Sequence, residues 1–115
     1  MIEISAAELK SRLDRGERLH LLDVREEHEL DRERFEGAEH IPLLELLWGE
    51  RAPSCPADAE LVILCHVGIR SLEAARFLRA QGYPRACSLA GGLAAFSSLP
   101  PVCGPGRSGP EALSS

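Results

Sequence analysis

The feature that most constrains the fold is a run of four consecutive apolar residues, Leu61–Leu64, followed closely by an amphipathic pattern over residues 71–81. Four apolar residues in a row are typical of a strand that is covered on both faces. In the second segment Leu72, Ala75 and Leu78 share one face of a helix. A doubly covered strand with a helix directly after it predicts a parallel sheet between layers of helices.

The rest of the chain continues this alternation. Further strands are predicted over residues 2–4, 19–24 and Ala86–Leu89. Helices are predicted to begin at Ser5, to lie within residues 25–34 and over residues 43–48, and to begin again within residues 91–96. Ser5 and Glu8 have the spacing of a capping box, in which each side chain bonds a backbone amide at the helix start. The pattern as a whole predicts an α/β fold.

The length of the chain limits the protein to one domain. A chain of 115 residues is near the commonest size of a single domain, and 44% apolar residues supply one modest core. From residue 97 onward Ser, Pro and Gly dominate, and no apolar period remains. We therefore predict one domain over residues 1–98 and a tail over residues 99–115 that is disordered or loosely docked.

Charge and hydropathy argue against two classes of partner. The net charge of −5 is unsuited to nucleic acid, which requires a clustered basic face. No stretch reaches the length of a membrane span. Residues 1–10 carry Glu3 and Glu8 and lack a long apolar run, so no secretory signal is expected. We expect a cytoplasmic protein with neither nucleic acid nor membrane as a partner.

The four cysteines are irregularly spaced and include no C-x-x-C pair: Cys55, Cys65, Cys87 and Cys103. Without a secretory signal, free thiols are favoured over a disulfide framework. The close pair Cys65 and His66 is adjacent in sequence, and adjacent residues rarely chelate one metal well, so no metal and no cofactor is expected. Cys103 is either a resolving thiol for Cys65 or a tail cysteine without a role.

Cys65 stands where open α/β sheets bind their ligands. It directly follows Leu61–Leu64, and the helical pattern begins a few residues later, so the loop joins the carboxyl end of a strand to the amino end of a helix. Amides at a helix start and in successive loop residues favour a negatively charged atom. Gly68 permits positive φ values, and Arg70 adds a permanent positive charge. A Cys65 thiolate would lie at the focus of these groups and act as a nucleophile.

Four segments in order resemble the motifs of the rhodanese family. The loop itself consists of Cys65, His66, Val67, Gly68, Ile69, Arg70 and Ser71. It resembles the family's active-site loop, in which a cysteine is followed by four residues, an arginine and often a serine. Residues 21–26, 37–42 and 89–92 resemble the family's Leu-Asp-Val-Arg-Glu strand, its Gly-Ala-x-His-Ile-Pro segment and its late Gly-Gly turn. Four motifs in the family's order are much more specific than one.

The resemblance implies a three-layer α/β sandwich with a central, mostly parallel, five-stranded sheet flanked by helices. It also implies sulfur transfer through a Cys65 persulfide, from thiosulfate or a persulfide donor to a thiol or cyanide acceptor. The loop amides would hold the persulfide, and Arg70 would orient an anionic donor. Ser71 is expected to cap the following helix. Asp23 and Arg25 are expected to pair near the strand ends and support the loop.

Other functions stay open at this point. Val67 and Ile69 make the rim of the loop apolar, which favours a persulfide relay or regulatory module that docks on a protein partner. His66 stands where thiosulfate-using relatives often have arginine, and it is either an exposed loop residue or a proton-transfer group. A related phosphatase or arsenate reductase is disfavoured, because the phosphatases have one more residue between the cysteine and the arginine.

Overall fold

The computed structural model describes residues 2–30 and 35–98 of the chain. The predicted tail, residues 99–115, lies outside the described residues, and so does the end of the charged segment, residues 31–34. Within the described part, short strands and helices alternate along the chain, as the apolar patterns predict.

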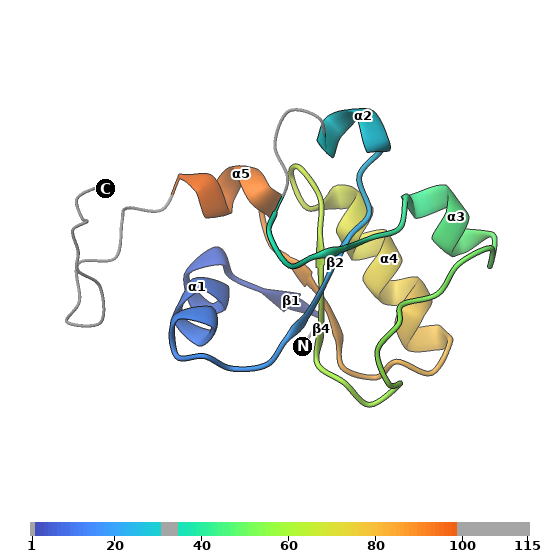
Figure 1. The fold of residues 1–115 in the computed structure, drawn as a ribbon, viewed down its shortest axis with the longest axis horizontal. Coiled ribbons are helices and arrows are strands. Elements are labelled where there is room, and N and C mark those ends of the chain that lie inside the picture. The colour runs from blue at the N-terminus through green and yellow to red at the C-terminus, as the bar shows by residue number, and fades with distance from the viewer. Residues whose placement is uncertain (1, 31–34, 99–115) are drawn as a thin grey trace.

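The strands form one sheet (Figure 1). Every pair of neighbouring strands is parallel, and their order is β1-β5-β4-β2-β3. The central strand β4 pairs with β5 along one edge and with β2 along the other, and all of its residues are buried because side chains from both helix layers pack on its faces. The predicted α/β fold with a parallel five-stranded sheet is thereby confirmed. The strands are β1 (Glu3–Ile4), β2 (His20–Asp23), β3 (Glu39–His40), β4 (Leu61–Leu64) and β5 (Ala86–Leu89).

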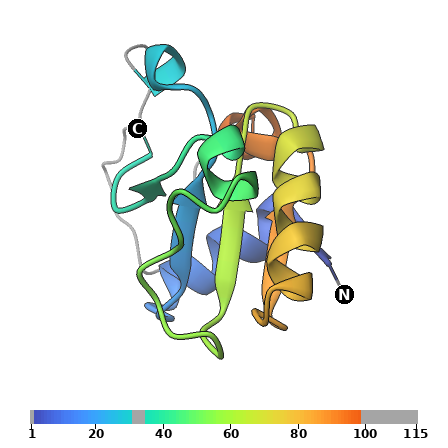
Figure 2. The same ribbon diagram turned by 90° about the vertical axis from the view of Figure 1, so that its right-hand side faces the viewer.

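Helices cover both faces of this sheet, which gives the three layers (Figure 2). Successive side chains of β4 point to opposite faces. Leu61 and Ile63 pack in the cluster that includes α3 and α4, and Val62 and Leu64 pack in the cluster that includes α1 and α5. The helices are α1 (Ala6–Asp14), α2 (Glu27–Leu30), α3 (Leu43–Leu47), α4 (Ile69–Ala80) and α5 (Gly92–Ser97).

The two helices that meet the cysteine loop both begin after a glycine in the left-handed conformation. Gly68 precedes α4 with φ +98°, and Gly91 precedes α5 with φ +75°. The expectation that Ser71 caps α4 is wrong, because the helix begins two residues earlier, at Ile69. Since Gly68 turns the chain directly into the helix, Ser71 falls in the first turn and its side chain points inward, where it is fully buried.

The Ser5 half of the predicted capping box is present at the start of α1. The amide of Glu8 donates to Oγ of Ser5 at 3.0 Å. None of the helices in the described residues is both long enough and apolar enough to cross a membrane.

Candidate active site

Cys65 lies at the carboxyl end of β4 with its sulfur directed into the loop that follows. Its side chain is buried, with 1% of the residue exposed. The amide of Gly68 donates to Sγ at 3.0 Å, and the amide of Ser71 donates at 3.3 Å. Two backbone donors at the start of α4 therefore converge on the sulfur, an arrangement that suits an atom carrying negative charge.

Ser71 extends this contact into the sheet. Its hydroxyl accepts from the Cys65 thiol at 3.3 Å and shares a hydrogen bond with the hydroxyl of Ser88 in β5 at 2.7 Å. Both serines are fully buried. Each hydroxyl in this line has a partner, so the polar groups behind the sulfur are satisfied without water.

The opposite side of the loop is held by the start of α5. The amide of Leu93 donates to the carbonyl of Cys65 at 2.8 Å, and the amide of Ala94 donates to the carbonyl of His66 at 3.0 Å. Gly92 lies so close that a side-chain carbon there would be 2.4 Å from the His66 carbonyl oxygen. The loop is thus clamped between two helix starts, one facing the sulfur and the other facing the loop carbonyls.

Arg70 points to a carboxylate on another element. Its guanidinium donates two hydrogen bonds to Glu29 of α2, at 2.7 and 2.9 Å. This bidentate contact raises the pKa of Arg70 further above its usual range. In this structure the guanidinium predicted to orient an anionic donor is therefore engaged by Glu29.

This pair makes the stability of the protein depend on pH. The hydrogen bonds from Arg70 lower the pKa of Glu29 from its ordinary 4.5 to about 2, against the opposing effect of burial. Because the folded-state pKa is depressed, the stabilisation is fully present above the unfolded-state value and is lost as the pH falls through the folded-state value.

We expect the difference in free energy of unfolding between the natural protein and Glu29→Gln to stay constant from neutral pH down to about pH 5. It should shrink as the pH falls from 4.5 to about 2. Urea titrations across this range measure the difference. A difference that persists unchanged at pH 2 would contradict the role assigned to the pair.

Asp23 and Arg25 form the predicted pair, at the end of β2. Both are buried, and Nη2 of Arg25 is 2.8 Å from Oδ2 of Asp23. The backbone amide of Arg25 also donates to Asp23, at 3.0 Å. His40 of β3 contacts the Arg25 carbonyl at 2.7 Å, so the pair holds the strand ends beside α2.

We expect Asp23→Asn to lower the free energy of unfolding by about 2 kcal/mol, because it leaves the buried guanidinium without a full counter-charge. Chemical denaturation measures the change. The matched control is Glu45→Gln, which removes the charge from an exposed pair with Arg51 and should cost less than about 0.5 kcal/mol. Equal losses of unfolding free energy in the two variants would show that burial does not make the Asp23–Arg25 pair more important for stability than an exposed pair.

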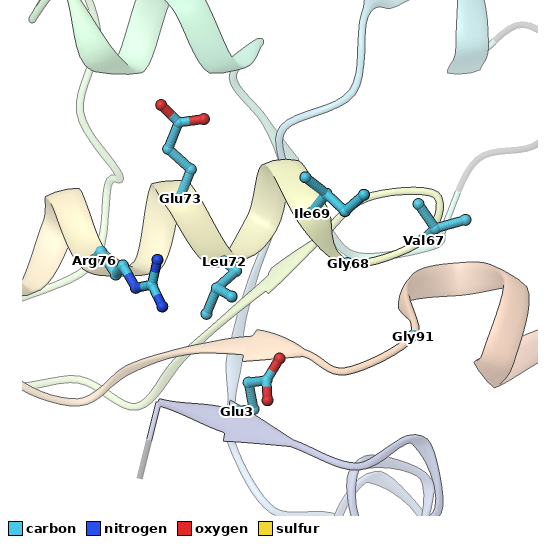
Figure 3. A pocket seen from close by; sticks show the side chains of 8 residues that line it. All are labelled: Glu3, Val67, Gly68, Ile69, Leu72, Glu73, Arg76 and Gly91. Carbon is cyan, nitrogen blue, oxygen red and sulfur yellow. The ribbon is translucent and has the colours of Figure 1, made fainter.

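The remaining loop side chains form an exposed rim. His66 is exposed, Val67 is 49% exposed and Ile69 is 74% exposed. Beside this rim lies a cleft of about 560 Å³ between α4 and the edge strand β1 (Figure 3). Cys65 does not line the cleft, which is bordered by Glu3, Val67, Gly68, Ile69, Leu72, Glu73, Arg76 and Gly91.

Several residues that complete the site were not singled out from the sequence as part of it. The sequence pattern places Glu29 only in a charged, solvated segment and Ser88 only in a strand. Gly92 was expected to permit a turn, which it does with φ +66°, but its contact with the loop carbonyls gave no sequence signal. No group of three or more potential metal ligands occurs in the part of the chain that the structure describes.

The fold and the site together define a class of protein. A cysteine at the carboxyl end of the central strand, with its sulfur facing the amides at the start of the next helix, is typical of α/β proteins that use a cysteine nucleophile on a sulfur- or phosphorus-centred anion. A family model described as "Rhodanese-like domain" matches residues 5–99. The chain belongs to this family of sulfur-transfer proteins.

Individual relatives agree with this assignment. A sulfurtransferase of Allochromatium vinosum is 34% identical over 95 residues, which cover 83% of this chain and 87% of that protein. The human single-domain sulfurtransferase TSTD1 has a similar structure, with a TM-score of 0.70, 32% identity and coverage of 80% of this chain and 91% of that one. YrkF of Bacillus subtilis, whose name includes the words "sulfur carrier protein", is 37% identical over 91 residues. The match covers 79% of this chain but spans only 48% of YrkF, about half of its length.

Proposed function

We propose that the protein is a sulfurtransferase that carries sulfane sulfur as a persulfide on Cys65. The observation that supports this most is the pair of amides, from Gly68 and Ser71, that point at Sγ of Cys65. Sγ carries negative charge as the attacking thiolate and again when the acceptor takes the outer sulfur, and backbone donors fixed in advance stabilise such a charge. The proposed donors are thiosulfate or a persulfide, and the proposed acceptors are cyanide or a thiol.

The reaction has two displacement steps. With thiosulfate, the Cys65 thiolate attacks the outer sulfur, a new S–S bond forms, and the old S–S bond breaks with its electron pair leaving on sulfite. Cyanide or a thiolate then attacks the terminal sulfur of the persulfide, and the electron pair of that S–S bond returns to Cys65. The enzyme alternates between two covalent forms, so ping-pong kinetics are expected.

Mass spectrometry of the intact protein tests this proposal. After treatment with thiosulfate or a small persulfide, the protein should gain the mass of one sulfur atom, and peptide mapping should place that sulfur on Cys65. Addition of cyanide should remove it and release thiocyanate. A protein that never gains sulfur, or that gains it on Cys55 or Cys87 alone, would overturn the proposal.

A second candidate function is a persulfide relay that docks on one protein partner and turns over small donors poorly. The exposed apolar side chains of Val67 and Ile69, next to the cleft beside α4, favour this role. Transfer rates from thiosulfate and from a persulfidated protein separate the two candidates. A relay should accept sulfur from the protein much faster, and should lose this advantage in Ile69→Ser.

We further propose a cytoplasmic location. A persulfide carrier requires its cysteine to be kept as a thiol, and Cys65 forms no disulfide in this structure. Fractionation of cells followed by immunoblotting tests the location.

A further inference from the structure

Glu29 is held in place from two sides. Its Oε1 accepts from the backbone amide of Glu26 at 2.8 Å, as a residue in the first turn of α2 that reaches back to the helix start. The same carboxylate receives both hydrogen bonds from Arg70. The two side chains are only 26% and 34% exposed, so solvent screens this pair less than an ordinary surface pair.

The consequence is that, in the part of the chain that the structure describes, the site holds little uncompensated positive charge. Arg70 ends the cysteine loop, and its charge is balanced by Glu29. Arg25, which also acts electrostatically on Glu29, is balanced in the same way by Asp23. What faces Sγ directly is two backbone amides and the hydroxyl of Ser71, which carry only partial charges. Such a site can hold one negative charge well, but among the residues that the structure describes a second charge on the donor finds no unpaired guanidinium facing Sγ.

We propose that Glu29 determines the charge of the sulfur donor: by engaging Arg70, it makes the site select singly charged or neutral donors over the thiosulfate dianion. Glu29 touches neither the sulfur nor the donor, so it is a positioning residue that acts through Arg70. The inference rests on the proposed function, because it concerns which donor loads Cys65.

Two donors that transfer the same sulfur but differ by one charge test this inference. Thiosulfate and methanethiosulfonate each transfer their outer sulfur to the Cys65 thiolate. A new S–S bond forms at Cys65 and the S–S bond of the donor breaks, so the leaving groups are sulfite and methanesulfinate, respectively. With cyanide as the common acceptor, the ratio of kcat/KM for thiosulfate to kcat/KM for methanethiosulfonate reports the preference for charge. The reaction of the persulfide with cyanide is the same for both donors, so it does not affect the ratio of the two kcat/KM values.

Glu29→Gln keeps the shape of the side chain and an oxygen for the Glu26 amide while removing the charge. We expect this variant to raise the thiosulfate-to-methanethiosulfonate ratio about tenfold, because the Arg70 charge becomes available to the dianion. In an Arg70→Gln background the same substitution should leave the ratio within about twofold, since the group through which Glu29 acts is absent. Glu45→Gln, which breaks the remote pair with Arg51, is the control and should leave the ratio unchanged.

The outcomes separate the inference from the function on which it rests. A ratio that is unchanged in Glu29→Gln, or equal losses with both donors, would overturn the inference and assign Glu29 a structural role only. A rise that persists in the Arg70→Gln background would also overturn it. If neither donor adds sulfur to the natural protein, as judged by intact mass, the proposed function itself fails.

Discussion

Replacing Cys65 by serine is expected to abolish sulfur transfer and to leave the fold intact. A hydroxyl is a far weaker acid and nucleophile than a thiol, and it forms no persulfide, so the rate should fall by at least about a thousandfold. The smaller serine oxygen still accepts hydrogen bonds from the amides of Gly68 and Ser71, which in the natural protein donate to Sγ of Cys65. The free energy of unfolding should therefore change by no more than about 1 kcal/mol.

Release of thiocyanate from thiosulfate and cyanide measures the loss of activity, and circular dichroism during denaturation measures the stability. Cys87→Ser is the matched control, because it removes a half-buried thiol from the neighbouring strand β5 without touching the loop. The control should keep its activity. Transfer that survives in the Cys65 variant would place the nucleophile elsewhere and end the proposed mechanism.

The second large effect, on the free energy of unfolding, is expected at Gly92, where the backbone of α5 contacts the backbone of the cysteine loop. A side-chain carbon at this position would be 2.4 Å from the His66 carbonyl oxygen and 2.6 Å from the Cys65 carbonyl oxygen. Both contacts are with backbone, which has no rotamer to change. The φ of +66° adds a conformational cost for any residue with a Cβ. We expect Gly92→Ala to lower the free energy of unfolding by about 4 kcal/mol, from overpacking and backbone strain together.

A glycine in the same conformation but in open space provides the control. Gly16 has φ +79° and no heavy atom within 4 Å of where its Cβ would lie. Gly16→Ala should cost about 1 kcal/mol, the conformational cost alone. Thermal and urea denaturation compare the two variants. If they lose equal stability, then the close approach of α5 to the loop contributes nothing, and the clamp described above is wrong.

The Gly92 variant also links stability to function. The amides of Leu93 and Ala94 bind the carbonyls of Cys65 and His66 only because α5 begins this close to the loop. When α5 is pushed away, the loop loses these two hydrogen bonds and the sulfur loses its fixed position relative to the start of α4. Any Gly92→Ala protein that folds at low temperature should therefore transfer sulfur more slowly than the Gly16→Ala control.

Local patterns were sufficient to predict the central part of the fold. The apolar run Leu61–Leu64 predicts a strand covered on both faces, and β4 is the middle strand of the sheet. The order of strand, loop and helix places Cys65 at the edge where parallel strands end, which depends only on near neighbours in the chain. The sequence pattern places the start of α4 two residues too late, because serine is a typical capping residue, whereas Ser71 is a buried member of the first turn.

The contacts that decide how the site works join residues far apart in the chain. Glu29 and Arg70 are separated by 41 positions, and Ser71 and Ser88 by 17. Which of many charged side chains meets Arg70 depends on the strand order β1-β5-β4-β2-β3, which brings the end of β2 and the helix after it beside the cysteine loop. The sequence by itself determined the main elements and the place of Cys65 at the sheet edge, because these follow from periodicity and turn chemistry. Only the tertiary structure decided the partner of Arg70 and the closeness of Gly92 to the loop, because such contacts form when packing brings distant segments together.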